Sequence, residues 1–319
     1  MSAASLGSRA IIGTFYNKLH QYMGDSWINQ VAMLFSSDQE SETYKWLGMA
    51  PMMREWIGGR NAKGFRDNGI TITNKEFEAT LEVLLSEIRR DKTGQVMLRV
   101  ADMARRTGGH WAKLLSTLIT NATGSDSGLC YDGQYFFDDD HSEGDSGTQK
   151  NLLTATEVPA LDVTIATAPT PTEAAKAILG VIAYMLTYKD DTGEPMNADA
   201  RSFLVMTSPT LWPFISAAIY NPLVGSGETN PLAGIMANTK FRIDVEPNPY
   251  LAYTTQFACF RSDSETKPFI MQEEAGVQVS ALAEGSEEAF KNKRHLYGVS
   301  ATRNVGYGFW QHGAHATFS

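Results

Sequence analysis

The fold is decided by residues 93–122, which read TGQVMLRVADMARRTGGHWAKLLSTLITNA. On a helical wheel one face of this stretch is almost entirely apolar: Val96, Val100, Met103, Ala104, Thr107, Trp111, Leu114, Leu115 and Leu118. The pattern keeps its phase across Gly108 and Gly109, although each glycine costs about 1 kcal/mol in a helix interior. We therefore predict one helix of about 30 residues and about 45 Å, bent at most at the glycine pair. We interpret the apolar stripe as a core seam rather than a ligand site.

Length and composition predict a soluble protein with a sizeable core. The chain has 319 residues, 43% of them hydrophobic, enough for two domains or one elaborate one. Cys130 and Cys259 offer neither zinc spacing nor a disulfide framework, so we expect a reducing compartment. Because the sequence shows no signal-peptide pattern and no apolar run long enough to cross a bilayer, we expect an intracellular product without a membrane partner.

The charge is distributed unevenly. The formal net charge is −9; residues 1–125 hold 15 Lys and Arg against 12 Asp and Glu, and residues 126–319 hold 12 against 24. This balance argues against tight binding of nucleic acid through a basic stripe. The asymmetry fits two interpretations, contacts between different parts of neighbouring copies or an ordinary solvated acidic surface.

Two N-terminal segments lack a core of their own. The apolar side chains of the first share one helical face: Ile11, Ile12, Phe15, Leu19, Tyr22 and Met23. This short amphipathic helix precedes a polar run at 36–42 and needs a surface to lie on, in its own subunit or in another.

The second segment predicts an extended β-hairpin. Apolar and aromatic residues gather around Pro51, and Asn68-Gly69 is a strong tight-turn signal. From Ile70 to Val83 apolar and polar residues then alternate, the period of a half-buried strand. A projecting hairpin is marginal unless it lies against something else.

The second half of the chain alternates helix and strand signals. Thr170-Pro171-Thr172-Glu173 is a capping box with proline at the first helical position, and predicts a helix ending near Tyr188. A second helix is expected from Ser208 to Ile219. Strands are expected at 203–206, 241–245, 257–260 and 269–271, and at 296–317 as two strands joined near Asn304.

Several short blocks follow one another in a characteristic order. They are Val31-Ala32-Met33, Thr43-Tyr44-Lys45-Trp46-Leu47-Gly48, Glu55-Trp56-Ile57-Gly58 with Arg60, Asn74-Lys75 with Phe77-Glu78, Cys130-Tyr131-Asp132-Gly133-Gln134 with Phe136-Phe137 and His141, and Gly306-Tyr307-Gly308-Phe309-Trp310-Gln311. In this order the chain resembles the major head subunit (T protein) family of Mu-like phages and prophages. Any one block is weak, but the ordered set is specific; residues 150–290 match only loosely.

The resemblance implies an α+β architecture, the Hong Kong 97-type tailed-phage capsid fold. It divides the chain into an N-terminal arm (1–45), an extended hairpin loop or E-loop (46–85), a peripheral domain with the spine helix (86–150 and 291–319) and an axial domain (151–290). The arm and the hairpin would rest on neighbouring subunits, which supplies the support that each one lacks.

The implied function is that of a major capsid protein, which self-assembles into the icosahedral shell around the double-stranded DNA genome of a tailed phage. Its partners would be other copies, in hexamers and pentamers, with scaffold, portal and decoration proteins. Its location would be the virion, after assembly in the host cytoplasm. DNA would be enclosed without sequence-specific binding, and no cofactor is implied. The candidate subunit-interface residues are Phe15, Trp46, Trp56, Arg60, Lys63, Arg66 and Lys75.

The sequence contains no catalytic or metal-binding motif that indicates an enzyme. Asp138-Asp139-Asp140-His141 groups metal-capable side chains, but consecutive side chains diverge in an extended segment, which favours a solvated loop. Gly225-Ser226-Gly227 lacks the third glycine of the dinucleotide fingerprint. The sequence has no Gly-x-Ser-x-Gly elbow and no His-Glu-x-x-His pair.

Some alternatives stay open at the level of sequence. Capsids of the resembled fold in some cases cross-link a lysine to an asparagine of the adjacent subunit. Lys63 and Lys75 lie near the predicted hairpin, although a surface lysine is the simpler interpretation of both. Trp46, Trp56 and Trp310 either anchor subunit contacts or fill the core. The rival functions are an encapsulin-like compartment and a metal-dependent hydrolase using 138–141.

Overall fold

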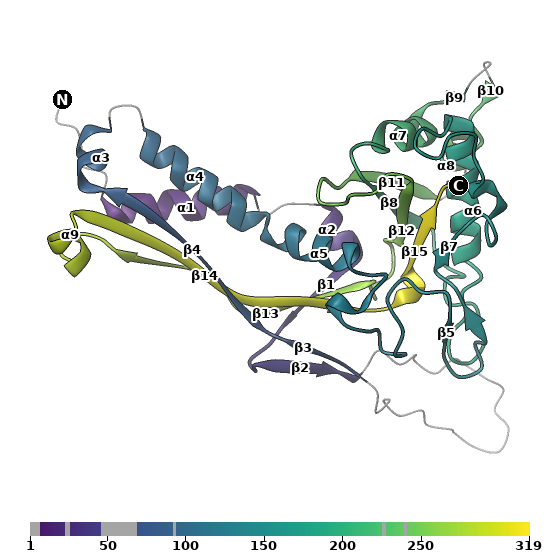
Figure 1. Ribbon diagram of the computed structural model, residues 1–319, viewed down its shortest axis with the longest axis horizontal. Helices are drawn as coiled ribbons and strands as arrows, with labels where there is room; N and C mark the ends of the chain where they lie inside the picture. The colour runs from purple at the N-terminus through teal and green to yellow at the C-terminus, as the bar shows by residue number, and fades with distance from the viewer. Residues whose placement is uncertain (1–6, 23–25, 46–68, 92–93, 225–227, 239–240) are drawn as a thin grey trace.

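The computed structural model describes residues 7–22, 26–45, 69–91, 94–224, 228–238 and 241–319. Figure 1 shows an elongated half, built from long strands and helices, and a compact half around a second sheet. The cluster predicted around Pro51, and Asn68 of the predicted tight turn, lie outside the described residues. Within those residues, no helix is long and apolar enough to span a membrane.

The predicted spine consists of two consecutive helices, α4 (Gln95–Gly108) and α5 (His110–Thr120). The prediction of one continuous helix is wrong at Gly109, where φ is −77° and ψ is 5°, outside the α-helical region. The Gly109 N–H still donates to Arg105 O at 3.0 Å, so the two helices follow each other without a loop. Gly108 serves packing, because a Cβ there would lie 3.1 Å from Tyr22 Cβ.

The apolar stripe of the spine faces two separate cores. Val96 and Val100 of α4 belong to a small core in the elongated half, whereas Leu115 and Leu118 of α5 belong to the large core that extends through the compact half. The interpretation of the stripe as a core seam is therefore confirmed. At Gly109 the apolar stripe passes from the small core to the large core.

The N-terminal amphipathic segment forms α1 (Ser8–Tyr22), which packs along α4 of the same subunit. Ile11, Phe15 and Leu19 are buried there, with Phe15 only 3% exposed. The apolar face of this part of the arm therefore finds the surface that it needs in its own subunit. A lone helix of this length is marginal in water, and α4 with the adjacent sheet offers the apolar surface that stabilises it.

A four-stranded sheet forms the elongated half, in the order β1-β13-β14-β4. Its strands are β1 (Ala32–Ser36), β13 (Phe269–Leu282), β14 (Arg294–Tyr307) and β4 (Lys75–Leu84). The short helices of this half are α3 (Leu85–Arg90) and α9 (Glu287–Lys291), whereas α2 (Ser26–Val31) packs against β1 and α5 in the large core. Figure 1 shows the β13–β14 hairpin running from α9 at the far end to the compact half.

A five-stranded sheet, in the order β11-β8-β12-β15-β7, forms the centre of the compact half. Its strands are β11 (Arg242–Pro247), β8 (Ser202–Thr207), β12 (Gln256–Arg261), β15 (Gly313–Thr317) and β7 (Leu152–Leu153). Its helices are α6 (Pro171–Met185), α7 (Trp212–Tyr220) and α8 (Pro231–Asn238). The predicted capping box is confirmed: Glu173 N donates to Thr170 Oγ1 at 3.3 Å, and Thr170 N donates to Glu173 Oε2 at 2.9 Å.

In the described residues, three short strand pairs lie outside the two larger sheets. They are β2 (Ser41–Tyr44) with β3 (Ile70–Thr73), β5 (His141–Ser142) with β6 (Thr148–Gln149), and β9 (Leu223–Val224) with β10 (Glu228–Thr229). The alternating stretch predicted as one strand from Ile70 is divided at Asn74, so that β3 pairs with β2 while β4 pairs with β14.

The C-terminal residues pass from one half to the other. β14 runs through Asn304 in the elongated sheet, and β15 then pairs with β12 and β7 in the compact sheet. The predicted junction near Asn304 is therefore wrong, since it lies at 308–312. The expected boundary at residue 291 also fails, because β13 belongs to the elongated sheet and β15 to the compact one. Linear order cannot reveal such an exchange, because strand partners are chosen in three dimensions.

Replacing Phe15 by Ala should lower the free energy of unfolding of the unassembled subunit by about 3–5 kcal/mol, the usual cost of emptying a buried phenylalanine site. Asn17→Ala, on the exposed face of α1, is the matched control and should change this free energy by less than about 0.5 kcal/mol. Urea unfolding followed by circular dichroism measures both. Equal effects of the two substitutions would contradict the packing of α1 on α4.

Candidate assembly site: the stalk and the buried junction

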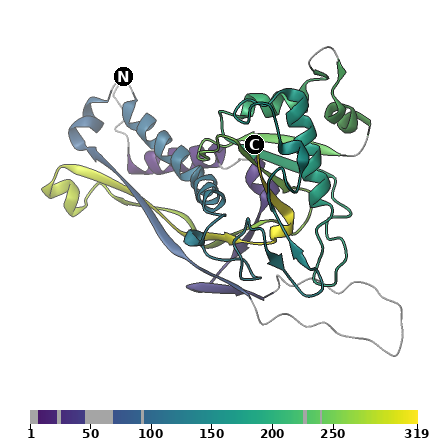
Figure 2. The ribbon, with the colours of Figure 1, turned by 45° about the vertical axis from the view of Figure 1, so that its right-hand side comes forward.

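The strands β2 and β3 form a projecting pair that we call the stalk. They run antiparallel, with Ser41 opposite Thr73 and Tyr44 opposite Ile70. Figures 1 and 2 show the stalk on the side of the β13–β14 hairpin opposite α4. Within the described residues it is a separate two-stranded sheet, so backbone pairing does not join it to the elongated sheet. The stalk carries the sequence that lies between its two strands.

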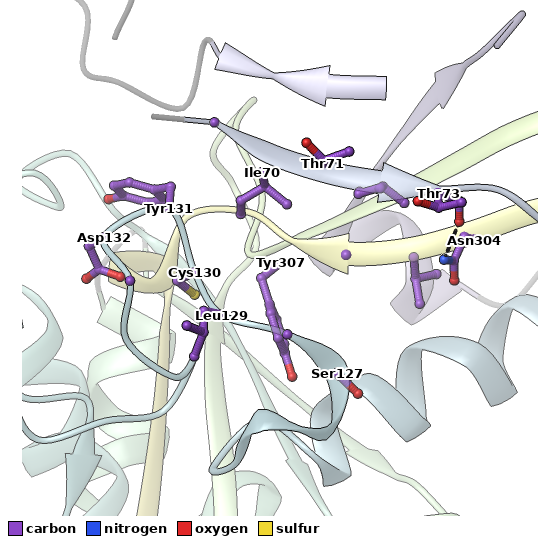
Figure 3. A pocket seen from close by; sticks show the side chains of 16 residues that line it. Ile70, Thr71, Thr73, Ser127, Leu129, Cys130, Tyr131, Asp132, Asn304 and Tyr307 are labelled. Atoms are coloured by element: carbon purple, nitrogen blue, oxygen red, sulfur yellow. Dashed lines mark hydrogen bonds between the residues drawn. The ribbon is translucent and has the colours of Figure 1, made fainter. Parts of the chain in front are cut away.

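A pocket of about 740 Å³ lies between β3, residues 127–133 and the end of β14. Figure 3 shows Asn304 of β14 beside Thr73, where Asn304 Nδ2 donates a hydrogen bond to Thr73 O at 2.7 Å. At Gly306 the approach of β3 is closer still, because a Cβ on this residue would overlap the side chain of Ile72. The stalk is therefore held against β14 by a hydrogen bond and by a contact that requires glycine.

The structure places two of the seven candidate interface residues. Lys75 is exposed at the start of β4, opposite Arg303 of β14. Phe15 is buried against α4 and the sheet, so it cannot contact a neighbouring subunit in this conformation. The other five lie outside the described residues: Trp46, Trp56, Arg60, Lys63 and Arg66.

The blocks at 130–141 and 306–311 meet at a buried polar junction between the two halves. His141 has no exposed surface, its Nδ1 lies 2.6 Å from Asp132 Oδ2, and its ring stacks on Trp310 with centroids 4.0 Å apart. His141 Nε2 lies 3.2 Å from Asn151 Oδ1. Trp310 therefore fills the core, and the two blocks depend on each other although they lie far apart in the sequence.

The aspartates considered as metal ligands stabilise a turn. Asp138 accepts hydrogen bonds from the N–H groups of Tyr135 (3.1 Å) and Asp139 (2.7 Å). Asp140 Oδ1 accepts one from Gln134 Nε2 at 2.5 Å. In the part of the chain that the structure describes, no three His, Cys, Asp or Glu side chains are grouped to hold a metal ion.

Asn197 joins the compact half to the same junction. Its Nδ2 donates to the carbonyl oxygens of Met185 (2.9 Å) and Gln311 (2.8 Å). Its Oδ1 accepts from Arg261 Nη1 (3.2 Å) and lies 3.1 Å from His312 Nδ1. A buried amide with partners on both of its ends favours a single arrangement of the segments around it.

Two buried histidines of this region are neutral at pH 7. Burial, reinforced by the charges of Arg261 and Lys267, lowers the pKa of His312 to about 3. Burial lowers the pKa of His315, in β15, to about 4. His312 Nε2 lies 2.9 Å from Thr266 Oγ1, a hydroxyl that can donate to the neutral ring.

Sequence reasoning missed the amides that hold these parts together, three of them buried and two, Asn74 and Asn304, half-buried. They are Asn74, Asn151, Asn197, Gln272 and Asn304. The available signal is an amide beside apolar residues, as Gln272 stands after Phe269-Ile270-Met271. The same pattern occurs on the solvated face of ordinary strands, so it could not have identified these roles.

Comparison with solved structures shows which fold this is. The procapsid of bacteriophage JBD30 aligns over 100% of this chain and 77% of its own, with a TM-score of 0.54 and 23% identity. The mature capsid of bacteriophage PhiM1 aligns over 93% of this chain and 88% of its own, with a TM-score of 0.54 and 10% identity. The fold is therefore the Hong Kong 97-type fold of tailed-phage capsid subunits, as the sequence resemblance implied.

Comparison with sequences defines the family. The family described as Mu-like prophage major head subunit gpT matches residues 9–170 and 252–317. The Mu-like prophage FluMu major head subunit of Haemophilus influenzae is 32% identical over 135 residues, 41% of this chain and 43% of that protein. The major capsid protein of Escherichia phage Mu is 33% identical over 116 residues, 36% of this chain and 37% of that protein. The matched part thus spans less than half of either relative. The chain belongs to the Mu-like prophage major head subunit gpT family.

Acid should weaken the folded subunit through its buried histidines. The pKa of His312 is about 3 in the folded chain, below the roughly 6.5 of an unfolded histidine. Its contribution to stability is therefore complete above about pH 6.5 and is lost as the pH falls toward the folded pKa, at up to about 1.4 kcal/mol per pH unit. His312→Gln should flatten the dependence of the free energy of unfolding on pH between about 6.5 and 4.

Urea unfolding of unassembled subunits at a series of pH values measures this dependence. His20→Gln, at an exposed position of α1, is the control and should keep the slope of the unmodified chain. An unchanged slope in His312→Gln would show that the buried ring does not couple folding to protons.

Proposed function

We propose that this chain is a major capsid protein, many copies of which close the icosahedral shell of a tailed-phage head around double-stranded DNA. The observation that carries the proposal is the coincidence of family and fold. The chain belongs to a head-subunit family, and its full length aligns with a capsid subunit. Its role in this proposal is structural rather than catalytic, and it takes no cofactor.

Assembly in this proposal is mechanical. The stalk and the sequence it carries contact a neighbouring copy, and five interface candidates belong to that sequence: Trp46, Trp56, Arg60, Lys63 and Arg66. Lys75, exposed beside the stalk, is the sixth. Each contact is small, but one subunit makes several at once, and such contacts add through effective concentration.

The compact half supplies a second kind of contact in the proposal, around the axes of pentamers and hexamers. Large apolar side chains are exposed on α7 and on the strand that follows it, β9: Trp212, Tyr220 and Leu223. Exposed apolar residues on consecutive elements are typical of protein contact surfaces. They support packing of neighbouring compact halves against one another.

The negative net charge supports a shell that encloses DNA without binding it tightly. Residues 126–319 hold 24 Asp and Glu against 12 Lys and Arg, which disfavours binding to phosphates. Weak binding leaves DNA free to be packaged and released. Scaffold, portal and decoration proteins are the further partners we propose, with assembly in the host cytoplasm and the virion as final location.

Concentrating the purified chain should produce rings or closed shells, because many weak contacts become effective together once copies are abundant. Electron microscopy and light scattering measure this outcome. Small monodisperse particles that persist at every concentration would contradict the proposed function.

Unassembled subunits should not retain duplex DNA at about 150 mM salt, since their acidic surface repels phosphates. Filter binding over a salt series measures the affinity. A tight complex whose affinity does not respond to salt would contradict confinement without binding.

A further inference from the structure

Gln272 of β13 is fully buried and contacts both strands of the stalk. Its Oε1 accepts a hydrogen bond from Tyr44 Oη of β2 at 2.8 Å. Its Nε2 donates to Ile72 O of β3 at 3.1 Å and to Asn74 Oδ1 at 2.9 Å. The amide of Gln272 therefore accepts a hydrogen bond from β2 with its oxygen and donates one to β3 with its nitrogen.

Asn74 fixes the direction in which this cluster points. Its Nδ2 donates to Gln39 O at 2.8 Å and to Ser37 Oγ at 3.3 Å, and its backbone N–H donates to Glu40 O at 2.8 Å. These partners hold the amide so that Oδ1 faces Gln272. The residue after β3 is thereby tied to the segment before β2, which closes the base of the stalk.

The cluster stands on an inner strand of the elongated sheet, which is paired on both sides. The backbone of Gln272 lies between β1 and β14, opposite Phe35 on one side and Asn304 on the other. The stalk itself consists of two strands of four residues each, a size that does not hold its own position. The side chains of Gln272 and Asn304 bond it to this sheet.

We propose that Gln272 is a positioning residue for shell assembly, which sets the angle at which the stalk leaves the elongated sheet. The angle decides where the sequence carried by the stalk meets the neighbouring subunit, and so affects how uniformly the shell closes. This inference rests on the proposed function. It adds that the orientation of the stalk is determined by hydrogen bonds within one subunit, before that subunit contacts a neighbour.

Substitutions can loosen the cluster in graded steps. Gln272→Met keeps an unbranched side chain of similar length but removes three hydrogen bonds, leaving the hydroxyl of Tyr44 and the carbonyl of Ile72 without this partner. Tyr44→Phe removes one of the three and keeps the ring in place. Gln278→Met, at an exposed position of the same strand, is the matched control.

Hydrogen exchange of the unassembled full chain measures the hold on the stalk, at residues 41–44 and 70–73. We expect exchange there to be about tenfold faster in Gln272→Met and less accelerated in Tyr44→Phe, with the amides of α6 unchanged. Gln278→Met should match the unmodified chain throughout. Equal acceleration of exchange in α6 would indicate general destabilisation. Unchanged exchange at 41–44 and 70–73 would show that Gln272 does not hold the stalk. Either result overturns the inference.

Electron microscopy of assembled particles measures the consequence for the shell. We expect Gln272→Met to give a broad range of diameters and open sheets, where the unmodified chain and Gln278→Met give one diameter. Uniform shells from Gln272→Met, despite a loosened stalk, would overturn the positioning role. Failure of the unmodified chain to form shells would contradict the proposed function instead, and the exchange data on single subunits would still decide the hold of Gln272 on the stalk.

Discussion

The antiparallel pairing of β13 with β14 is the constraint on which the rest of the structure depends. The register joins Phe269 to Tyr307 at one end and Leu282 to Leu296 at the other, so the hairpin spans the elongated half. β1 and β4 extend the sheet on its two edges, and α1 and α4 cover the face opposite the stalk. β14 then continues through a short turn into β15, and thereby connects the two halves through the backbone itself.

Two kinds of interaction stabilise this architecture. Apolar contacts give most of the stability, because burial of apolar area is the largest favourable term in folding. They are not directional, however, and a seam such as that of α5 would tolerate small shifts. The buried amides Asn197 and Gln272 add direction, since each would leave several polar groups without partners if the segments moved. They lie at the joint between the halves and at the base of the stalk.

In the proposed function, this division suits a subunit that works by contact. The projecting stalk and the exposed apolar residues of the compact half can add small repeated contacts only if each copy presents them in the same orientation. The hydrogen bonds of Gln272 at the base of the stalk favour one orientation of the stalk in every copy. The apolar face of α1 completes the core of its own subunit.

The sequence by itself determined the spine stripe, the capping box of α6, the amphipathic α1 and, through ordered blocks around Tyr131 and Trp310, the family and its fold. These features are local in periodicity or spacing, so residues near one another in the chain suffice to reveal them. Only the tertiary structure decided where α1 lies, that the seam divides at Gly109, that β15 crosses into the compact sheet, and that Gln272 holds both strands of the stalk. Each of these depends on partners distant in the sequence. The type of a side chain, polar or apolar, does not indicate which distant surface it will contact.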